Sequence, residues 1–126
     1  MYNEKFNERF VKQHAPGDVV FREGDRGHAM YVVLAGSIDI VKRNDAEDLC
    51  IANLGTGEMF GEMALIDSGT RMATAKAGAD GAKLMSIDQA RFVYMVGQQP
   101  AFALAVMQTM AKRLAKPAPT LALAPN

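Results

Sequence analysis

Between Val19 and about Ile87 the chain alternates short apolar stretches with glycine-bearing turns. The apolar stretches are rich in Val, Ile, Leu, Met and Phe, and the turns recur at intervals of roughly 8 to 15 residues. This spacing is typical of an antiparallel sandwich or barrel, and eight or so strands fit between the turns. The turn segments are Pro16-Gly17-Asp18, Glu23-Gly24-Asp25, Ala35-Gly36-Ser37, Gly55-Thr56-Gly57-Glu58, Ser68-Gly69 and Gly78-Ala79-Asp80-Gly81.

Two neighbouring stretches carry the clearest strand patterns. Residues 30–34 are continuously apolar, which indicates a strand buried in the core. Residues 37–42 nearly alternate apolar and polar side chains, which indicates a strand with one solvated face. We therefore predict a hairpin that turns through Ala35-Gly36.

Helical periodicity replaces the strand pattern after Ile87. Asp88 is suited to cap a helix in which apolar residues recur at three- and four-residue spacing. A second helix is predicted from Pro100, since proline is favoured in a first helical turn, and Pro117 ends it. At the other end of the chain, Phe6, Phe10 and Val11 share one side of a predicted amphipathic helix over residues 2–13.

Length and charge narrow the classes of protein. With 126 residues the chain has room for one core, so we expect a single domain. Its net charge is zero, with 14 basic and 14 acidic side chains, and it lacks the basic field that drives general nucleic-acid binding. Residues 89–126 carry four cations and no acid. Three of the four lie near a predicted helix C-terminus, whose dipole favours cations, and this explanation is preferred to nucleic-acid binding.

Cysteine content and hydropathy bear on the compartment. Cys50 is the only cysteine, so no internal disulfide and no cysteine-based metal centre is expected. The longest apolar run, residues 101–107, is far shorter than the 18 or so residues that a membrane-spanning helix requires. We expect a cytoplasmic protein that does not associate with membranes.

The residues that carry chemistry lie between Gly55 and Ala75. Gly61 lets the backbone approach a ligand, and the free amides of a short helical turn from Gly61 to Leu65 suit an anion. Arg71 offers a planar fork for a phosphate or carboxylate, and Glu62 accepts hydrogen bonds from hydroxyls. The alternative is a structural ion pair between Glu62 and Arg71, and the two residues alone do not decide between these interpretations.

The surrounding residues resemble a known cassette. Phe60-Gly61-Glu62-Met63-Ala64-Leu65 followed by Arg71-Met72-Ala73-Thr74 is similar to the phosphate-binding cassette of the cyclic nucleotide-binding domain family. Residues 17–25 and 30–38 look like the first strands of that family. The resemblance implies a mainly β fold, an eight-stranded antiparallel jelly-roll barrel of the double-stranded β-helix type. In one domain over residues 1–116, it implies an N-terminal helix at 1–15, the β-roll at 16–87 and C-terminal helices at 88–116, followed by a Pro/Ala-rich tail at 117–126.

The resemblance also assigns roles in the site. Glu62 would accept the ribose 2′-hydroxyl, and Arg71 would neutralise the exocyclic oxygens of the cyclic phosphate beside Gly61. The amides of Met63, Ala64, Met72 and Ala73 would complete the phosphate shell. Ile51, Ala52 and Leu54 are candidates for an apolar wall near the base, although only alternate residues of a strand face inward and plain core packing is an equal alternative.

Three departures from the family pattern matter. Thr70 stands where a proline commonly precedes the arginine, so Arg71 is expected to be less preorganised. Met72 stands where a Ser or Thr often accompanies cGMP preference, and its thioether cannot donate to guanine, which favours cAMP. Pro117 and Pro119 stop the last helix, so neither the long helix nor the DNA-binding module of catabolite-activator-type regulators is expected.

These observations favour a non-enzymatic cyclic nucleotide sensor, either a stand-alone domain or a fragment, that signals to a protein partner. The main alternative is a ligand-free interaction module with the same fold. A metal-dependent jelly-roll enzyme ranks third, because His14 and His28 are isolated and no further ligands converge in the sequence. We therefore expect no metal, no catalytic residues and no direct nucleic-acid partner.

Overall fold

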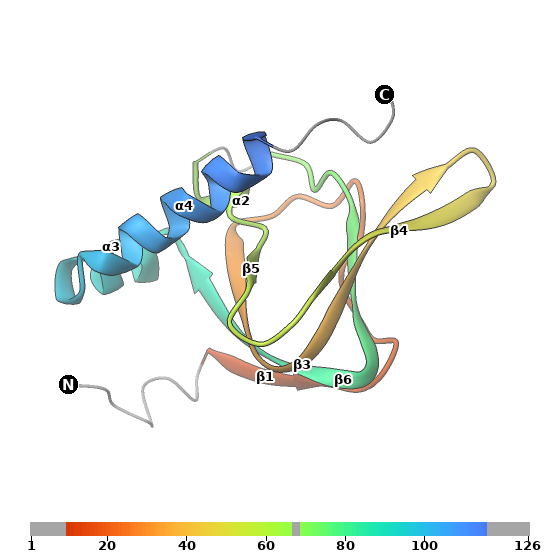
Figure 1. The fold of residues 1–126 in the computed structure, drawn as a ribbon, viewed down its shortest axis with the longest axis horizontal. Coiled ribbons are helices and arrows are strands. Elements are labelled where there is room, and N and C mark those ends of the chain that lie inside the picture. The colour runs from red at the N-terminus through yellow and green to blue at the C-terminus, as the bar shows by residue number, and fades with distance from the viewer. Residues whose placement is uncertain (1–9, 67–68, 116–126) are drawn as a thin grey trace. The chain divides into compact units, whose positions relative to one another are not determined.

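A computed structural model describes residues 10–66 and 69–115 and divides the chain into two compact units, Met1–Phe92 and Val93–Asn126. The first unit is a β-roll, and the second is helical (Figure 1). Among the described residues the strands are β1 (Val11–His14), β2 (Val19–Phe21), β3 (Ala29–Asn44), β4 (Glu47–Leu54), β5 (Met59–Phe60) and β6 (Thr74–Asp88). The helices are α2 (Met63–Ile66), α3 (Gln89–Gln98) and α4 (Ala101–Ala115).

The sheet is antiparallel, which confirms the predicted fold class. Its main path is β1-β6-β3-β4, with β2 paired to β6 and β5 paired to β3. The long strands β3 and β6 pair from Ala29↔Asp88 to Val41↔Thr74 and bend together around the core (Figure 1). The described residues contain six strands rather than eight, because β3 and β6 each span a region where two strands were expected.

The predicted hairpin through Ala35-Gly36 is wrong. β3 continues through Gly36 without a turn, and its register with β6 shifts on both sides of that glycine. Gly36 has a φ of 79°, and a Cβ there would overlap the carbonyl oxygen of Gly81 on β6. Residues 78–81 were also predicted as a turn, but they lie within β6, where Gly81 approaches Gly36 of β3. Both glycine segments are bulges at which two strands approach closely and bend.

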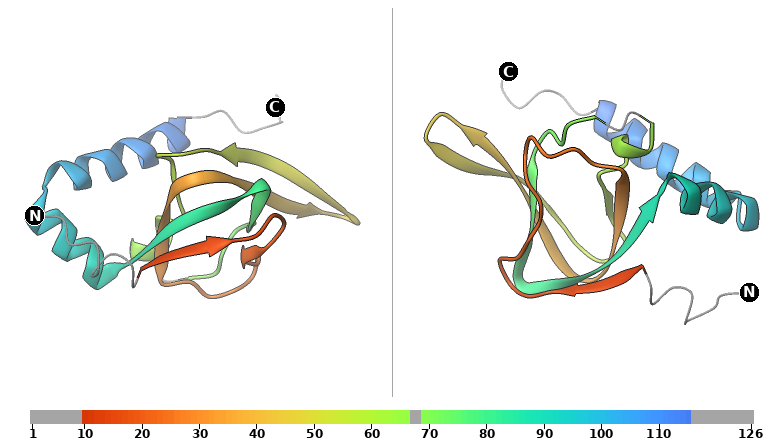
Figure 2. Two further views of the ribbon diagram at one scale, coloured as in Figure 1. Left: turned by 90° about the horizontal axis from the view of Figure 1, so that it is seen from below. Right: turned by 180° about the vertical axis from the view of Figure 1, so that it is seen from behind.

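The predicted N-terminal helix is also wrong for its described residues, which begin at residue 10. Residues 11–14 form β1, which pairs with β6 from Val11↔Met85 to His14↔Ala82 and lies beside it in Figure 2. The pairing partner on β6 lies some seventy residues away in sequence, and such a partner overrides weak helical periodicity. Residues 1–9, which the helix prediction also covered, lie outside the described residues.

The core of the roll combines aliphatic side chains with an aromatic group. Its largest fully buried side chains are Phe60, Met30, Ile38, Leu84, Ile87 and Val33. The rings of Tyr31 and Phe60 stack with centroids 5.2 Å apart, and Phe21 lies 5.9 Å from both. This group lies next to the segment that follows β5, where the candidate site begins.

The C-terminal helices form as predicted in their described parts. Asp88 Oδ1 accepts the Arg91 amide at 2.8 Å, which confirms Asp88 as the N-cap of α3. The second helix, α4, starts directly after Pro100. Its predicted stop at Pro117 and the predicted tail at 117–126 lie outside the described residues. Of the described helices, none is long and apolar enough to cross a membrane.

Candidate functional site

The segment between β5 and β6 carries the predicted site residues, and we call residues 60–74 the cassette. It passes from β5 through Gly61 and Glu62 into the single turn of α2 and returns at Arg71 toward β6. Gly61 has a φ of 75°, and a Cβ on it would lie 2.8 Å from Arg71 Nη1. The glycine therefore serves both the turn and the close approach of the arginine.

Arg71 is held by its backbone as well as by its side chain. Its amide donates to Asp25 O at 2.7 Å, and its carbonyl accepts the Gly24 amide at 2.9 Å. These two bonds fasten the arginine to the turn that follows β2. The turn was predicted from Glu23-Gly24-Asp25, but its contact with the cassette was not.

The guanidinium of Arg71 is buried, with the residue only 8% exposed. Nη2 donates to Ala29 O at 2.7 Å, Nη1 donates to Gly61 O at 3.3 Å, and Cζ lies 4.0 Å from the centroid of the Phe21 ring. Burial lowers the pKa of Arg71, but an arginine still carries its charge at neutral pH. Among the described residues, the buried Nε has no hydrogen-bond partner. An unpartnered, buried cationic donor suits an anionic ligand.

Gly27 makes room for this arrangement. A Cβ at position 27 would overlap Nε and Cζ of Arg71. Gly27, Phe21 and Ala29 were not assigned to the site from the sequence. Gly27 lies two residues after the predicted turn Glu23-Gly24-Asp25. Their proximity to Arg71 depends on the tertiary fold.

Glu62 lies next to this arrangement. It is 6% exposed, and it follows the glycine whose carbonyl accepts Arg71 Nη1. Among the described residues, the hydrogen bonds of the Arg71 guanidinium run to main-chain carbonyls rather than to Glu62. The described contacts thus place the Arg71 guanidinium against the residue that precedes Glu62.

The amides predicted to surround a phosphate differ in their surroundings. The Ala64 amide donates to Gly61 O at 3.2 Å, so it already closes the turn of α2. Met63 is the first residue of α2, with a side chain that is 58% exposed. Met72 is 75% exposed, and its carbonyl accepts Lys42 Nζ at 2.7 Å. Ala73 is half-buried just before β6.

The three residues proposed for a base pocket separate into two groups. Leu54 packs against the buried core cluster, as plain core packing requires. Ile51 is 55% exposed on β4, and Ala52 is half-buried opposite Ile40 of β3. The structure therefore leaves Ile51 and Ala52 accessible to a ligand and gives Leu54 a role in the core.

No group of three metal-ligating side chains occurs within residues 10–66 and 69–115. His14 lies at the end of β1, and burial, together with the charge of Lys12, lowers its pKa. His28 lies just before β3. Within the described residues, neither histidine belongs to a group of three such side chains.

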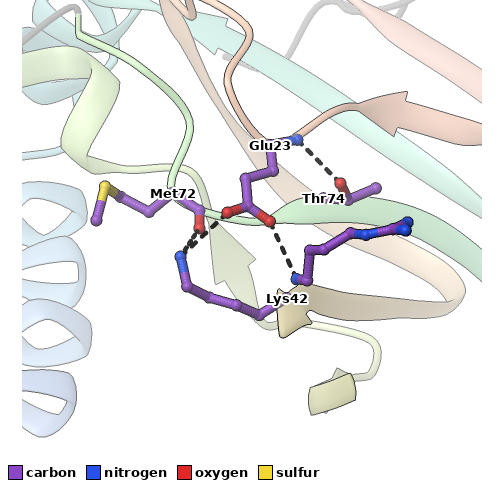
Figure 3. A network of polar contacts seen from close by, with 5 residues as sticks. Glu23, Lys42, Met72 and Thr74 are labelled. Carbon is purple, nitrogen blue, oxygen red and sulfur yellow. Dashed lines mark hydrogen bonds and ion pairs between the residues drawn. The ribbon is translucent and has the colours of Figure 1, made fainter. Parts of the chain in front are cut away.

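A polar network that includes Met72, the residue after Arg71, was also not predicted. It consists of Glu23, Lys42, Arg43, Met72 and Thr74, and we call it the Lys42–Glu23 network (Figure 3). Two hydrogen bonds lower the pKa of the Glu23 carboxyl below its ordinary value of 4.5. The bond from the Arg43 amide has the larger effect, and the bond from the Lys42 side chain has the next largest. The network thus favours the ionised form of Glu23.

This lowered pKa predicts a pH dependence. A carboxyl whose pKa is lower in the folded state than in the unfolded state stabilises the fold when the pH is above the unfolded-state pKa. This stabilisation is lost as the pH falls through the folded-state pKa. The difference in Tm between the wild type and Glu23→Gln should therefore narrow as the pH is lowered from about 6 to about 3. A thermal unfolding series checks this, and a difference that stays constant over that range would contradict it.

Comparison with known proteins agrees with the geometry. Residues 11–99 match the family described as the cyclic nucleotide-binding domain, and the chain belongs to this family. The chain is 32% identical over 110 residues to the cyclic AMP receptor protein of Thermus thermophilus, covering 86% of this chain and 49% of that protein. It therefore spans about half the length of that relative.

Solved structures place the fold in the same family. The crystal structure of the Thermus thermophilus catabolite activator protein is similar with a TM-score of 0.75 and 27% identity, covering 90% of this chain and 55% of that one. The cAMP-bound and cGMP-bound forms of the EAL enzyme Bd1971 are each 30% identical, with TM-scores of 0.63 and 0.64. Both cover 82% of this chain and 28% of that enzyme. The region that this chain shares with these proteins is the cyclic nucleotide-binding domain.

Proposed function

We propose that this chain binds a cyclic nucleoside monophosphate, with cAMP favoured over cGMP, and acts as a non-enzymatic sensor. The observation that carries this proposal is the buried Arg71 guanidinium, which has an unpartnered Nε and contacts the carbonyl of the residue before the buried Glu62. A singly charged cyclic phosphate supplies oxygens for that donor, and the adjoining ribose supplies a hydroxyl for a carboxylate.

Each residue then has a role. Arg71 neutralises the exocyclic phosphate oxygens, and the Gly61 turn lets the phosphate approach the backbone. Glu62 accepts the ribose 2′-hydroxyl, and the amides of Met63, Met72 and Ala73 remain candidates for the phosphate shell, with Ala64 contributing chiefly to the turn of α2. Because Arg71 is held by carbonyls and by the Phe21 ring before the ligand arrives, binding requires little ordering of that side chain.

Base preference rests on the residues at the edge of the cassette. Met72 carries a thioether, which cannot donate a hydrogen bond to guanine O6 or N7. Ile51 and Ala52 offer apolar surface that suits adenine and guanine alike. The preference for cAMP is accordingly expected to be modest.

The readout is expected to be a protein partner in the cytoplasm. Capture of the phosphate would bias the cassette and the helices that follow Asp88, and the ligand must favour one arrangement for this to signal. In the helical unit, four large apolar side chains are more than half exposed: Val93, Tyr94, Leu104 and Met107. These side chains also support the second candidate function, a nucleotide-independent interaction module.

Calorimetric titration with cAMP and, separately, with cGMP tests the proposal. We expect a saturable isotherm with one nucleotide per chain, tighter for cAMP. The protein should first be shown to be folded by circular dichroism and free of co-purified nucleotide by its ultraviolet absorbance ratio. No heat from either nucleotide in such a preparation would reject the sensor function in favour of the interaction module.

A further inference from the structure

Lys42 connects β3 to the segment between Arg71 and β6. Its Nζ donates to Met72 O at 2.7 Å and lies 3.3 Å from Glu23 Oε2 (Figure 3). Glu23 is itself fixed, since its Oε1 accepts the Arg43 amide at 3.1 Å and its own amide donates to Thr74 Oγ1 at 2.9 Å. One lysine and one glutamate thus join β3, the turn after β2 and the end of the cassette.

These bonds hold the short segment that carries Arg71, which lies just before β6. β6 begins at Thr74, so residues 71–73 precede the strand ladder and lack its regular hydrogen bonds. Arg71 is held on one side by Gly24 and Asp25. Lys42 holds the next residue, and Glu23 holds the first residue of β6. The segment that carries Arg71 is therefore fastened at both ends by side chains and turns rather than by the sheet.

We propose that Lys42 is a positioning residue for cyclic nucleotide binding, acting through the Met72 carbonyl on the placement of Arg71. This inference rests on the proposed function. A hydrogen bond from an ammonium group to a carbonyl is charge-assisted and stronger than a neutral one. Without it, the 71–73 segment samples more conformations, and the ligand must order that segment on binding.

The competing explanation is an ordinary surface ion pair. The side chains of Lys42 and Glu23 are 44% and 33% exposed, and pairs of that kind contribute little. The bond to Met72 distinguishes this lysine, because it reaches the main chain directly beside the arginine proposed to bind phosphate.

A cleft of about 550 Å³ lies beside the network. Glu23, Thr74 and Lys76 are among the residues that line it, and Glu62 and Arg71 are not.

The test compares Lys42→Met with Lys76→Met in the full chain. Lys76 lies on β6, five residues after Arg71, and its replacement removes the same charge without touching Met72. We expect Lys42→Met to weaken cAMP and cGMP by the same factor of about ten, and Lys76→Met to stay within about twofold of the wild type. Lys42→Arg, which restores a cationic donor, should recover most of the affinity.

Amide hydrogen exchange of the ligand-free protein supplies a readout that does not depend on nucleotide. Exchange should accelerate in residues 71–74 of Lys42→Met and stay unchanged in Lys76→Met. A thermal unfolding curve establishes that each variant is folded at the temperature of the titration.

Each other outcome overturns the inference. If the wild type binds and Lys42→Met binds equally well, Lys42 does not position Arg71, while the proposed function stands. Weakening of one nucleotide alone would instead indicate a direct contact between Lys42 and the base. Equal weakening by Lys76→Met would indicate a long-range charge effect. If the wild type binds neither nucleotide, the proposed function fails and the inference fails with it.

Discussion

Replacing Arg71 with alanine is expected to weaken cyclic nucleotide binding by at least about 100-fold while the β-roll stays folded. The substitution removes the buried cationic donor that we propose binds the phosphate, and the phosphate loses that charge-assisted contact. Calorimetric titration measures the loss. Circular dichroism and the Tm of the ligand-free variant report on the fold.

Two further variants sharpen this prediction. Arg71→Lys keeps the charge but loses the planar fork that contacts Gly61 O, Ala29 O and the Phe21 ring, so its affinity should fall between those of the wild type and the alanine variant. Arg26→Ala removes an exposed arginine from the neighbouring turn and should leave binding nearly unchanged. Unaltered affinity in Arg71→Ala would place the phosphate elsewhere.

Replacing Gly36 with alanine is expected to destabilise the fold by about 3 kcal/mol or more. Gly36 has a positive φ, and a Cβ there would overlap the Gly81 carbonyl at the point where β3 and β6 bend together. Backbone cannot move aside there as a flexible side chain can, so the bulge itself must open.

Gly57 offers a matched control for that substitution. It also has a positive φ, of 89°, but a Cβ there would meet nothing within 4 Å. Gly57→Ala should therefore cost only the conformational strain, about 1 kcal/mol. Denaturant unfolding of both variants separates the two effects, and equal losses would show that crowding between Gly36 and Gly81 does not matter.

Features encoded locally were predictable from the sequence. The Asp88 cap is one, since its side chain bonds an amide three residues on. The turn at Gly61 is another, since the glycine has a positive φ just before α2. The joint role of Glu62 and Arg71 in one site stays a prediction. The overall mainly β architecture follows from the spacing of turns and apolar stretches.

Features that depend on distant strands were not predictable. A glycine in a strand pattern indicates a bulge or a turn equally well, and Gly36 is a bulge only because Gly81 faces it. Val11–His14 became a strand because β6 offers an edge. The supports of Arg71, namely Phe21, Gly27 and Lys42, come from three separate parts of the chain, so no short motif contains them.

The pairing of β3 with β6 has a consequence for how the protein folds as it is made. Ala29 at the start of β3 pairs with Asp88 at the end of β6, so the longest ladder of the roll joins segments far apart in sequence. Until the ribosome has released Asp88, the main partner of β3 is incomplete, and only the β3–β4 hairpin and the β5 contact are available to it. The entropy of closing such a long loop is lost before the strand contacts form and offset it, which makes folding slow. The apolar face of β3 is therefore exposed during synthesis, when such surface promotes aggregation and binding by chaperones.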